Sequence, residues 1–447
     1  MSAFRPIVMI AAVAALSACS SAPKVWPFGS EAPGETAPSD GRISILSFEQ
    51  KLEVDAALAG RTPYVPPATE VADWHQPGGP EDNAARHASI DGNFSIVARR
   101  SVGQGSTSNA RISSPPVIAD GKVFVLDAGQ RLSAFPVNGG GRLWSRDLSP
   151  RRGRDKNALG GGVAFADGKL FVTSGYGFAA AIDASSGQEV WRTNTQAPIH
   201  AAPTVASGRV FAVTNDSELL ALDADTGAIQ WTHQAIAEPA RILSASSPAV
   251  KGDLVVAPFA SGEIVALLTA NGRRLWVDAL TRAGRLTSLS AINDIAGRPV
   301  AVDGVIYAAS HSGILAAIDQ RTGQRLWARG LASTQTPAVA GDTLFIVTVD
   351  GELAAIERMT GQVFWVTQLK RYRDEKDRKG RIAWTGPVLA GGKLVLASSE
   401  GQAVVVNPAS GAVDKTLNVG GPVYIAPIAA AGSVFLLSDE GKLVVIR

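Results

Sequence analysis

The sequence predicts an all-β protein, an eight-bladed β-propeller of four-stranded antiparallel blades, and three observations support this fold. Eight turn glycines recur at intervals of 37 to 52 residues, close to the length of one propeller blade. In six of the repeats a second glycine is followed four positions later by tryptophan. With 46% apolar and 18% charged residues, 46 glycines and 25 prolines, the composition is typical of a globular domain of short strands and turns.

Residues 1–18 have the features of a cleavable secretory leader. Arg5 precedes an apolar run from Ile7 to Leu16 that is too short to span a bilayer. The run ends at Leu16-Ser17-Ala18-Cys19, which resembles the lipobox of bacterial lipoproteins, and Cys19 is the only cysteine in the chain. The resemblance implies lipidation of the Cys19 thiol and firm attachment by several acyl chains. Because Ser20 stands where inner-membrane lipoproteins carry Asp, we expect the protein to be anchored at the periplasmic face of the outer membrane.

Residues 19–91 are expected to form a largely mobile tether that is rich in Pro, Ser, Ala and Glu. From Ser20 to Ile90, ten acidic residues exceed five basic ones. A more apolar stretch within the tether, residues 43–58, fits neither a helix nor a strand. Two interpretations of this stretch stay open: it becomes ordered on a partner, or it packs on its own propeller.

The repeats occupy residues 92–447 and share one plan. Each begins with a short strand, turns at the first glycine into a β-rich run, and continues with a third strand. A second turn then leads to the fourth strand and its tryptophan, 23 or 24 residues after the first glycine in six copies. We interpret this indole as core packing where neighbouring blades splay apart, since it buries about 200 Å². The glycines and tryptophans are Gly121, Gly168, Gly208, Gly252, Gly304, Gly341, Gly392, Gly432, Trp144, Trp191, Trp231, Trp276, Trp327 and Trp365.

The last repeat stops at Arg447 directly after a third strand over residues 442–446. A sheet left that way would have a long unpaired edge, which favours aggregation. The segment Phe94–Arg100, just before the first repeat, is a suitable fourth strand. We therefore predict that this N-terminal strand completes the last blade and closes the ring.

The turn before each tryptophan carries a specific pattern. Ala221-Leu222-Asp223 leads through Thr226-Gly227 to Trp231, and Ala317-Ile318-Asp319 leads through Thr322-Gly323 to Trp327. This ending resembles the repeats of pyrroloquinoline-quinone (PQQ) propellers, and the resemblance covers residues 92 to 447. It implies a fold more strongly than a function. We interpret the aspartates of the pattern, Asp183, Asp223 and Asp319, as turn-stabilising residues whose side chains bond nearby backbone.

Two families share this repeat and differ in their chemistry. The quinone-dependent dehydrogenases hold Ca²⁺ with a Glu, an Asn and a catalytic Asp, and many carry a vicinal disulfide. The present chain has no second cysteine, and its blades are near minimal length. It looks more like the BamB family of lipoproteins in the outer-membrane β-barrel assembly machinery, which implies no enzymatic activity and no cofactor. A periplasmic propeller that binds a peptide or glycan, and a PQQ-dependent dehydrogenase, stay as alternatives.

The resemblance to the BamB family also implies partners. It implies docking on the periplasmic POTRA domains of a BamA-type barrel subunit, in support of the folding and insertion of nascent outer-membrane proteins. The contact loops follow the third and fourth repeats, here residues 238–244 and 286–298, where arginines can pair with carboxylates and apolar residues, including Ile295, can serve as anchors. Exposed blade edges could pair with client strands as well. The candidate partner-binding residues are Arg241, Ile242, Leu243, Leu286, Asn293, Asp294 and Arg298.

Charge and spacing argue against other partners. The 42 basic and 40 acidic residues are nearly balanced and form no basic stripe with interleaved aromatics, so we expect no nucleic-acid binding. The five histidines have no metal-ligand spacing, so we expect no metal site. The charged run Arg371–Arg381 lies between the sixth and seventh blades, where it is either a solvated loop or a protruding contact loop.

Overall fold

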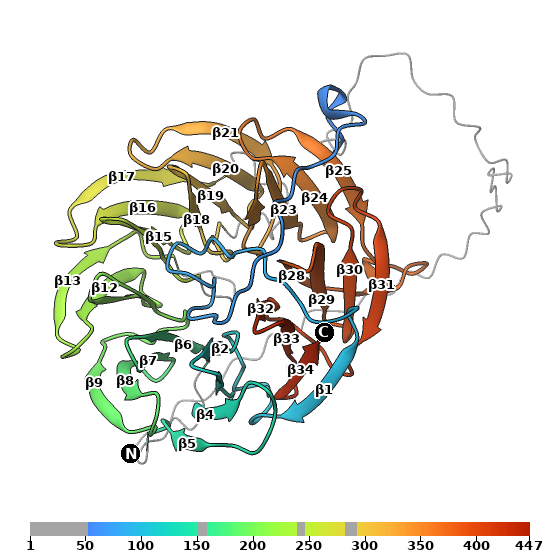
Figure 1. The fold of residues 1–447 in the computed structure, drawn as a ribbon. Coiled ribbons are helices and arrows are strands. Elements are labelled where there is room, and N and C mark those ends of the chain that lie inside the picture. Colours follow the sequence, from blue (N-terminus) through green and yellow to red (C-terminus); the bar gives the residue numbers. More distant parts are fainter. Residues whose placement is uncertain (1–51, 151–158, 239–245, 282–292) are drawn as a thin grey trace, which may run out of the picture. The chain divides into compact units, whose positions relative to one another are not determined.

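The computed structural model describes residues 52–150, 159–238, 246–281 and 293–447. Apart from the short 3-10 turn η2 (Ala56–Leu58), every regular element in these ranges is a β-strand. In the same ranges, no helix combines the length and the apolar character that a membrane crossing requires. The predicted eight-bladed β-propeller is confirmed, since eight four-stranded antiparallel sheets are arranged in a ring (Figure 1).

Seven blades are meanders of four consecutive strands that pair in chain order from the inside of the ring outward. Blades 1 to 4 comprise β2 (Val117–Ala119), β3 (Lys122–Leu126), β4 (Arg131–Pro136), β5 (Trp144–Asp147); β6 (Gly161–Ala166), β7 (Lys169–Ser174), β8 (Phe178–Asp183), β9 (Glu189–Asn194); β10 (Thr204–Ala206), β11 (Arg209–Val213), β12 (Glu218–Asp223), β13 (Ile229–Gln234); and β14 (Ala249–Lys251), β15 (Leu254–Pro258), β16 (Glu263–Leu268), β17 (Arg274–Ala279). Blades 5 to 7 comprise β18 (Val300–Val302), β19 (Val305–Ala309), β20 (Ile314–Asp319), β21 (Arg325–Gly330); β22 (Ala338–Ala340), β23 (Thr343–Val347), β24 (Glu352–Glu357), β25 (Val363–Gln368); and β28 (Trp384–Ala390), β29 (Lys393–Ser398), β30 (Gln402–Val406), β31 (Val413–Asn418).

The eighth blade combines both ends of the domain. Its inner strands are β32 (Ile428–Ala430), β33 (Ser433–Leu437) and β34 (Lys442–Ile446), and its outer strand is β1 (Ile96–Ser101). β1 runs antiparallel to β34, with Ile96 opposite Ile446 and Ser101 opposite Lys442. The outer edge of β34 is therefore paired, which removes the exposed edge that an incomplete blade would leave.

Each of the six repeat tryptophans joins its own blade to the next one. The indole Nε1 donates a hydrogen bond to a backbone carbonyl in the turn before the next outer strand, at 2.9 to 3.1 Å. The ring lies against the glycine of that turn; at Gly187, with φ +73°, an added Cβ would stand 2.7 Å from the Trp144 ring. Trp276 and Trp365 are buried and the other four are half-buried. The predicted role of these residues as inter-blade packing is confirmed.

The ring closes without a tryptophan. In the outer strand β1, the Arg100 guanidinium lies over the Phe135 ring of blade 1, 5.4 Å from its centroid. Its Nη1 donates to the Pro136 carbonyl at 3.1 Å. A cation–π contact and a hydrogen bond thus take the place of the indole at this junction.

The predicted turn aspartates also have their expected role. Asp183 Oδ1 accepts hydrogen bonds from the hydroxyls and backbone N–H groups of Ser185 and Ser186. These bonds lower the pKa of Asp183 to about 2. Asp223 and Asp319 accept equivalent bonds in their own turns. All three carboxylates serve local turn structure.

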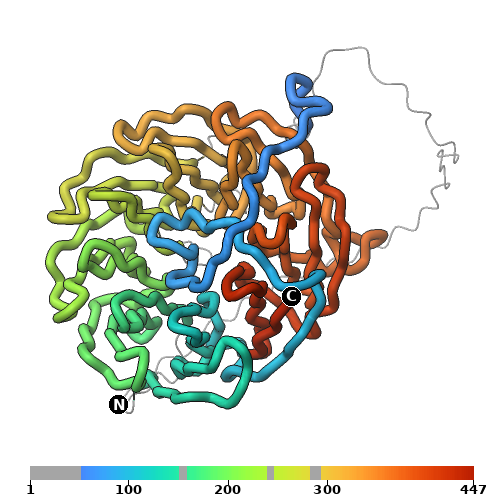
Figure 2. Tube along the Cα trace, viewed as in Figure 1, coloured from blue at the N-terminus to red at the C-terminus, as the bar shows by residue number. Residues whose placement is uncertain are grey.

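Residues 64–91, called the N-terminal strap below, run across the middle of the ring of blades (Figure 2). The strap forms hydrogen bonds with an inner strand or the following turn of every blade, because each inner strand has one edge that its own sheet leaves unpaired. The bonded pairs are Tyr64 with Asp342, Val71 with Ala431, Trp74 with Ile118, His75 with Phe165, Gln76 with Val205, Glu81 with Val250, Asp82 with Ala301, Ala88 with Leu389, and Asp91 with Gly432.

The expectation of a mobile tether over residues 19–91 is therefore wrong for residues 52–91. Asn83 illustrates the reason: its buried side-chain amide donates to the Pro248 and Pro299 carbonyls of two neighbouring blades. Leu52 and Leu58 pack on the propeller, which supports the second of the two interpretations of the stretch 43–58. Cys19 and residues 43–51 lie outside the described residues.

His87 fastens the strap to blade 7 and makes this attachment sensitive to pH. Its Nε2 accepts the Gly392 N–H at 2.8 Å, and its Nδ1 therefore carries the proton that bonds the Pro66 carbonyl at 2.7 Å. Burial lowers the pKa of His87 below its ordinary value of 6.5, against the opposing effect of the Pro66 bond. A histidine with a lowered pKa stabilises the fold above its unfolded pKa, and this contribution is lost as pH falls through the folded value.

We therefore expect the protein to lose stability between about pH 7.5 and pH 5, and the His87→Gln variant to lose less. Urea unfolding midpoints of both proteins at the two pH values test this. An equal loss in both proteins would show that protonation of His87 does not weaken the strap.

Candidate interaction face

The strap and a sizeable cavity lie at opposite ends of the ring. The strap bonds near the carboxyl ends of the inner strands and in the turns that follow them, as at Ile118 and Ala431. The cavity of about 460 Å³ is lined instead by residues that precede the inner strands, as at Ile112 and Val423. All inner strands run in the same direction through the ring, so these two sets belong to different ends. We call the cavity end the open face.

The cavity is lined by a mixture of apolar and polar side chains, and its size is that of a small-ligand site. Two arginines, Arg111 and Arg381, and one carboxylate, Asp439, are among its lining residues. The Glu, Asn and Asp donor set of quinone-dependent dehydrogenases is not gathered in this lining, so these residues do not fit that cofactor site. The lining residues are Arg111, Ile112, Ser113, Leu159, Gly160, His200, Thr334, Gln335, Thr348, Val349, Arg381, Ile382, Ala383, Trp384, Thr385, Val423, Tyr424, Ile425 and Asp439.

A hairpin stands beside the cavity. The charged run between blades 6 and 7 forms β26 (Tyr372–Asp374) and β27 (Lys379–Arg381), a hairpin that fits both a solvated loop and a contact loop. Its side chains from Arg373 to Arg381 are exposed. Six of the eleven residues from 371 to 381 are basic and three are acidic. The hairpin therefore presents a net positive charge on the open face.

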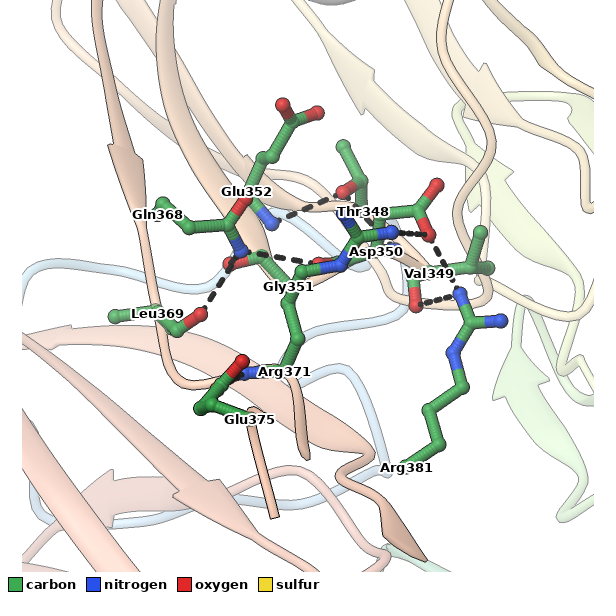
Figure 3. A network of polar contacts seen from close by, with 10 residues as sticks. All are labelled: Thr348, Val349, Asp350, Gly351, Glu352, Gln368, Leu369, Arg371, Glu375 and Arg381. Atoms are coloured by element: carbon green, nitrogen blue, oxygen red, sulfur yellow. Dashed lines mark hydrogen bonds and ion pairs between the residues drawn. The ribbon is translucent and has the colours of Figure 1, made fainter. Parts of the chain in front are cut away.

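Asp350 anchors the base of this hairpin (Figure 3). Its Oδ1 accepts hydrogen bonds from Nη2 of both Arg371 and Arg381, each at 2.7 Å. Arg381 also donates to the Val349 carbonyl at 2.8 Å. One carboxylate in the β23–β24 turn thus holds both ends of the hairpin, which fixes where the hairpin leaves the blade.

The described residues of the candidate partner-binding loops lie between an outer strand and the next inner strand, at this same end. Arg241, Ile242, Leu243 and Leu286 lie outside the described residues. Asn293 and Asp294 are described and are each 6% exposed. Asp294 borders a second cavity of about 50 Å³, and its backbone carbonyl accepts the His311 N–H.

Arg298 and Ile295 differ in what they offer a partner. Arg298 is half-buried, and burial lowers the pKa of its guanidinium to about 10, so it stays charged at neutral pH. Its guanidinium bonds the Thr336 hydroxyl at 3.4 Å, and within the described part of the chain it forms no ion pair. Ile295 is 1% exposed and packs in the core of blades 4 and 5. The expectation that Ile295 serves as an interface anchor is wrong, because a core side chain has no free surface.

Sequence patterns missed the cavity and the strap. The cavity residues come from several inter-blade connections and from turns within blades 6 and 8, and only ring closure brings these segments together. The charged run 371–381 did point to a feature of this face, although not to its hairpin form.

Comparison with known families identifies the chain. A family model described as "Outer membrane protein assembly factor BamB" matches residues 128–367, which is more than half of the sequence. The chain belongs to the BamB family. The matched region runs from the turn after β3 to β25 and therefore covers most of the first six blades.

The sequence identity of this chain to individual members of the BamB family and to other propellers is low. The BamB protein of Moranella endobia is 28% identical over 236 residues, 52% of this chain and 61% of that protein, so the match spans about three fifths of the relative. The crystal structure of BamB from Moraxella catarrhalis has a TM-score of 0.68 at 23% identity and covers 79% of this chain and all of its own. A quinohemoprotein alcohol dehydrogenase from Comamonas testosteroni has a TM-score of 0.64 at 15% identity, covering 85% of this chain and 81% of its own. At these identities the two structures show a shared fold and nothing further.

Proposed function

We propose that this protein is a lipid-anchored, non-enzymatic scaffold of the outer-membrane β-barrel assembly machinery. The observation that carries the proposal is membership of the BamB family across most of six blades, since that family is described as an outer-membrane protein assembly factor. The cavity lining does not match a quinone dehydrogenase, which supports a binding role over catalysis.

The proposed location follows from the N-terminal sequence. Residues 1–18 act as the leader, Cys19 receives the lipid, and Ser20 permits delivery to the outer membrane. The propeller then lies in the periplasm, attached to the inner leaflet through its lipidated N-terminus. No other part of the chain is proposed to enter the membrane.

The proposed partner is the BamA-type barrel subunit, bound through its POTRA domains by the loops of the open face. Arg241, Ile242, Leu243 and Leu286 would supply the contacts in the two loops after blades 3 and 4. Arg298 supports this placement, because a half-buried guanidinium with no carboxylate partner in the described residues is suited to a carboxylate on another protein. Asn293 and Asp294, being buried, would position the second loop and touch the partner only if it opens.

A pull-down with purified POTRA domains tests this proposal. The protein from Ser20 onward should bind them at low ionic strength, and Arg241→Ala should weaken the affinity by about tenfold or more. Arg142→Ala is the matched control, because Arg142 is exposed in a turn at the strap end of blade 1. This control should bind as the unaltered protein does.

Two results would contradict the proposal. If the unaltered protein does not bind at low salt, where charge pairs are least screened, the assembly role is wrong. If Arg142→Ala weakens binding as much as Arg241→Ala, the open face is not the docking face.

A further inference from the structure

A charge pair occurs between neighbouring outer strands at two of the blade junctions. It joins the residue two positions after one tryptophan to the residue two positions before the next. Arg146 and Glu189 form this pair between blades 1 and 2, at 3.5 Å. Asp278 and Arg325 form it with reversed charges between blades 4 and 5, at 2.6 Å. At these two junctions the outer rim therefore holds one cation and one anion at equivalent positions.

The pair is incomplete within the rim between blades 5 and 6. Arg329 occupies the cation position and donates to the Gly361 carbonyl, as Arg146 does to that of Gly187. The anion position holds Val363, which has no charge. The missing carboxylate comes instead from Asp55, which lies far away in the sequence and contacts Arg329 Nη2 at 2.5 Å.

Asp55 also occupies the free edge of β25. Its Oδ2 accepts the Val363 N–H at 2.7 Å, and its own N–H donates to the Val363 carbonyl at 3.0 Å. Both edge groups of Val363 are thus satisfied by one residue. The turn that holds Asp55 lies at the outer rim beside β25 (Figure 1).

Leu58 completes the contact three residues later. It is 1% exposed and belongs to the apolar cluster of blades 6 and 7 that includes Phe364. Phe364 stands directly before its tryptophan and is 5% exposed. Leu143, Val190 and Leu326 occupy the same position in other blades and are 50 to 52% exposed. The apolar rim residue is therefore covered in blade 6 and uncovered in those blades.

We propose that the rim between blades 5 and 6 is a docking site for a short Asp-x-x-Leu turn, in which residues 52–58 are a displaceable resident. A segment of the same pattern in another polypeptide takes their place. Its carboxylate binds Arg329 and the Val363 N–H, and its leucine covers Phe364. This site is separate from the open face and does not depend on the membrane role proposed above.

The resident segment is held by far fewer contacts than the strap. Its main attachments are one partly exposed ion pair, two backbone-edge bonds, the buried Leu58 and the half-buried Leu52. The linker from Ala59 to Thr62 is exposed, whereas the strap that follows contacts every blade. Release of residues 52–58 therefore leaves the strap and the ring intact. Because the resident is covalently attached, its high effective concentration disfavours a competing peptide.

A labelled peptide with the sequence of residues 50–60 tests the site by fluorescence anisotropy. The host is the full chain with Asp55→Ala and Leu58→Ala, which disables the resident segment. We expect saturable binding to this host and at least tenfold weaker binding to the unaltered chain. Adding Arg329→Ala to the host should weaken binding at least tenfold, whereas adding Arg146→Ala, at the rim site already completed by Glu189, should not change it.

Hydrogen exchange at the Val363 amide gives a second measurement that needs no change at Arg329. Exchange should be slow in the unaltered chain, faster in the host, and slow again when the peptide is added. Failure of the peptide to bind the host, or equal binding with and without Arg329, would overturn the proposal. So would a Val363 amide that the peptide leaves unprotected.

Discussion

Replacement of Trp365 by alanine is expected to lower the free energy of unfolding by about 3 to 5 kcal/mol, the range found when a buried tryptophan or phenylalanine is truncated. Trp365 is 8% exposed, its indole lies against Gly411 of the next blade, and its ring centroid is 6.1 Å from that of Phe345. Its Nε1 donates to the Pro408 carbonyl at 2.9 Å. The substitution therefore opens a cavity between two blades. Urea unfolding followed by circular dichroism measures the loss.

Two comparisons separate the contributions of the indole. Trp365→Phe keeps an aromatic ring but loses the bond to Pro408, so we expect a smaller loss, including about 1 kcal/mol for the hydrogen bond. Leu326→Ala, at a half-exposed position of the outer rim, should cost less than about 1 kcal/mol. If Trp365→Ala costs no more than Leu326→Ala, the indole does not hold the two blades together.

Replacement of Cys19 by serine is expected to release nearly all of the protein from the membrane fraction. Cys19 is the only cysteine, and on our proposal its thiol carries the lipid. Each buried acyl CH₂ contributes about 0.8 kcal/mol to membrane attachment, so loss of the chains removes the anchor. Ultracentrifugation of lysed cells, with detection of the protein in pellet and supernatant, measures the change. Incorporation of labelled palmitate should be lost in parallel.

The Ser20→Asp variant is the matched control, because it should keep the lipid anchor and change only the membrane to which the protein is delivered. It should remain bound to membranes and take up palmitate, but sediment with the inner membrane on a density gradient. If Cys19→Ser still sediments with membranes, attachment occurs through the folded domain or a partner, and the lipobox interpretation is wrong.

Local sequence patterns were sufficient to predict the propeller. The turn glycine, the Asp183-type carboxylate and the tryptophan interact with residues of the same blade or the next one, so their spacing repeats in the sequence. The same reasoning led to the strand from residue 94 to 100, because a third strand at 442–446 needs a partner. Each of these interactions depends on backbone geometry that a repeat must reproduce.

The sequence by itself thus determined the fold, the inter-blade role of the tryptophans and the candidate lipidated cysteine. Only the tertiary structure decided the course of residues 52–91, the cavity on the open face and the rim site of Arg329. Asn83 bonds carbonyls 165 and 216 residues away, and Asp55 bonds Arg329 at a separation of 274 residues. A segment that bonds to every blade has no repeating sequence pattern. Its partners lie on a ring that forms only when the whole domain folds.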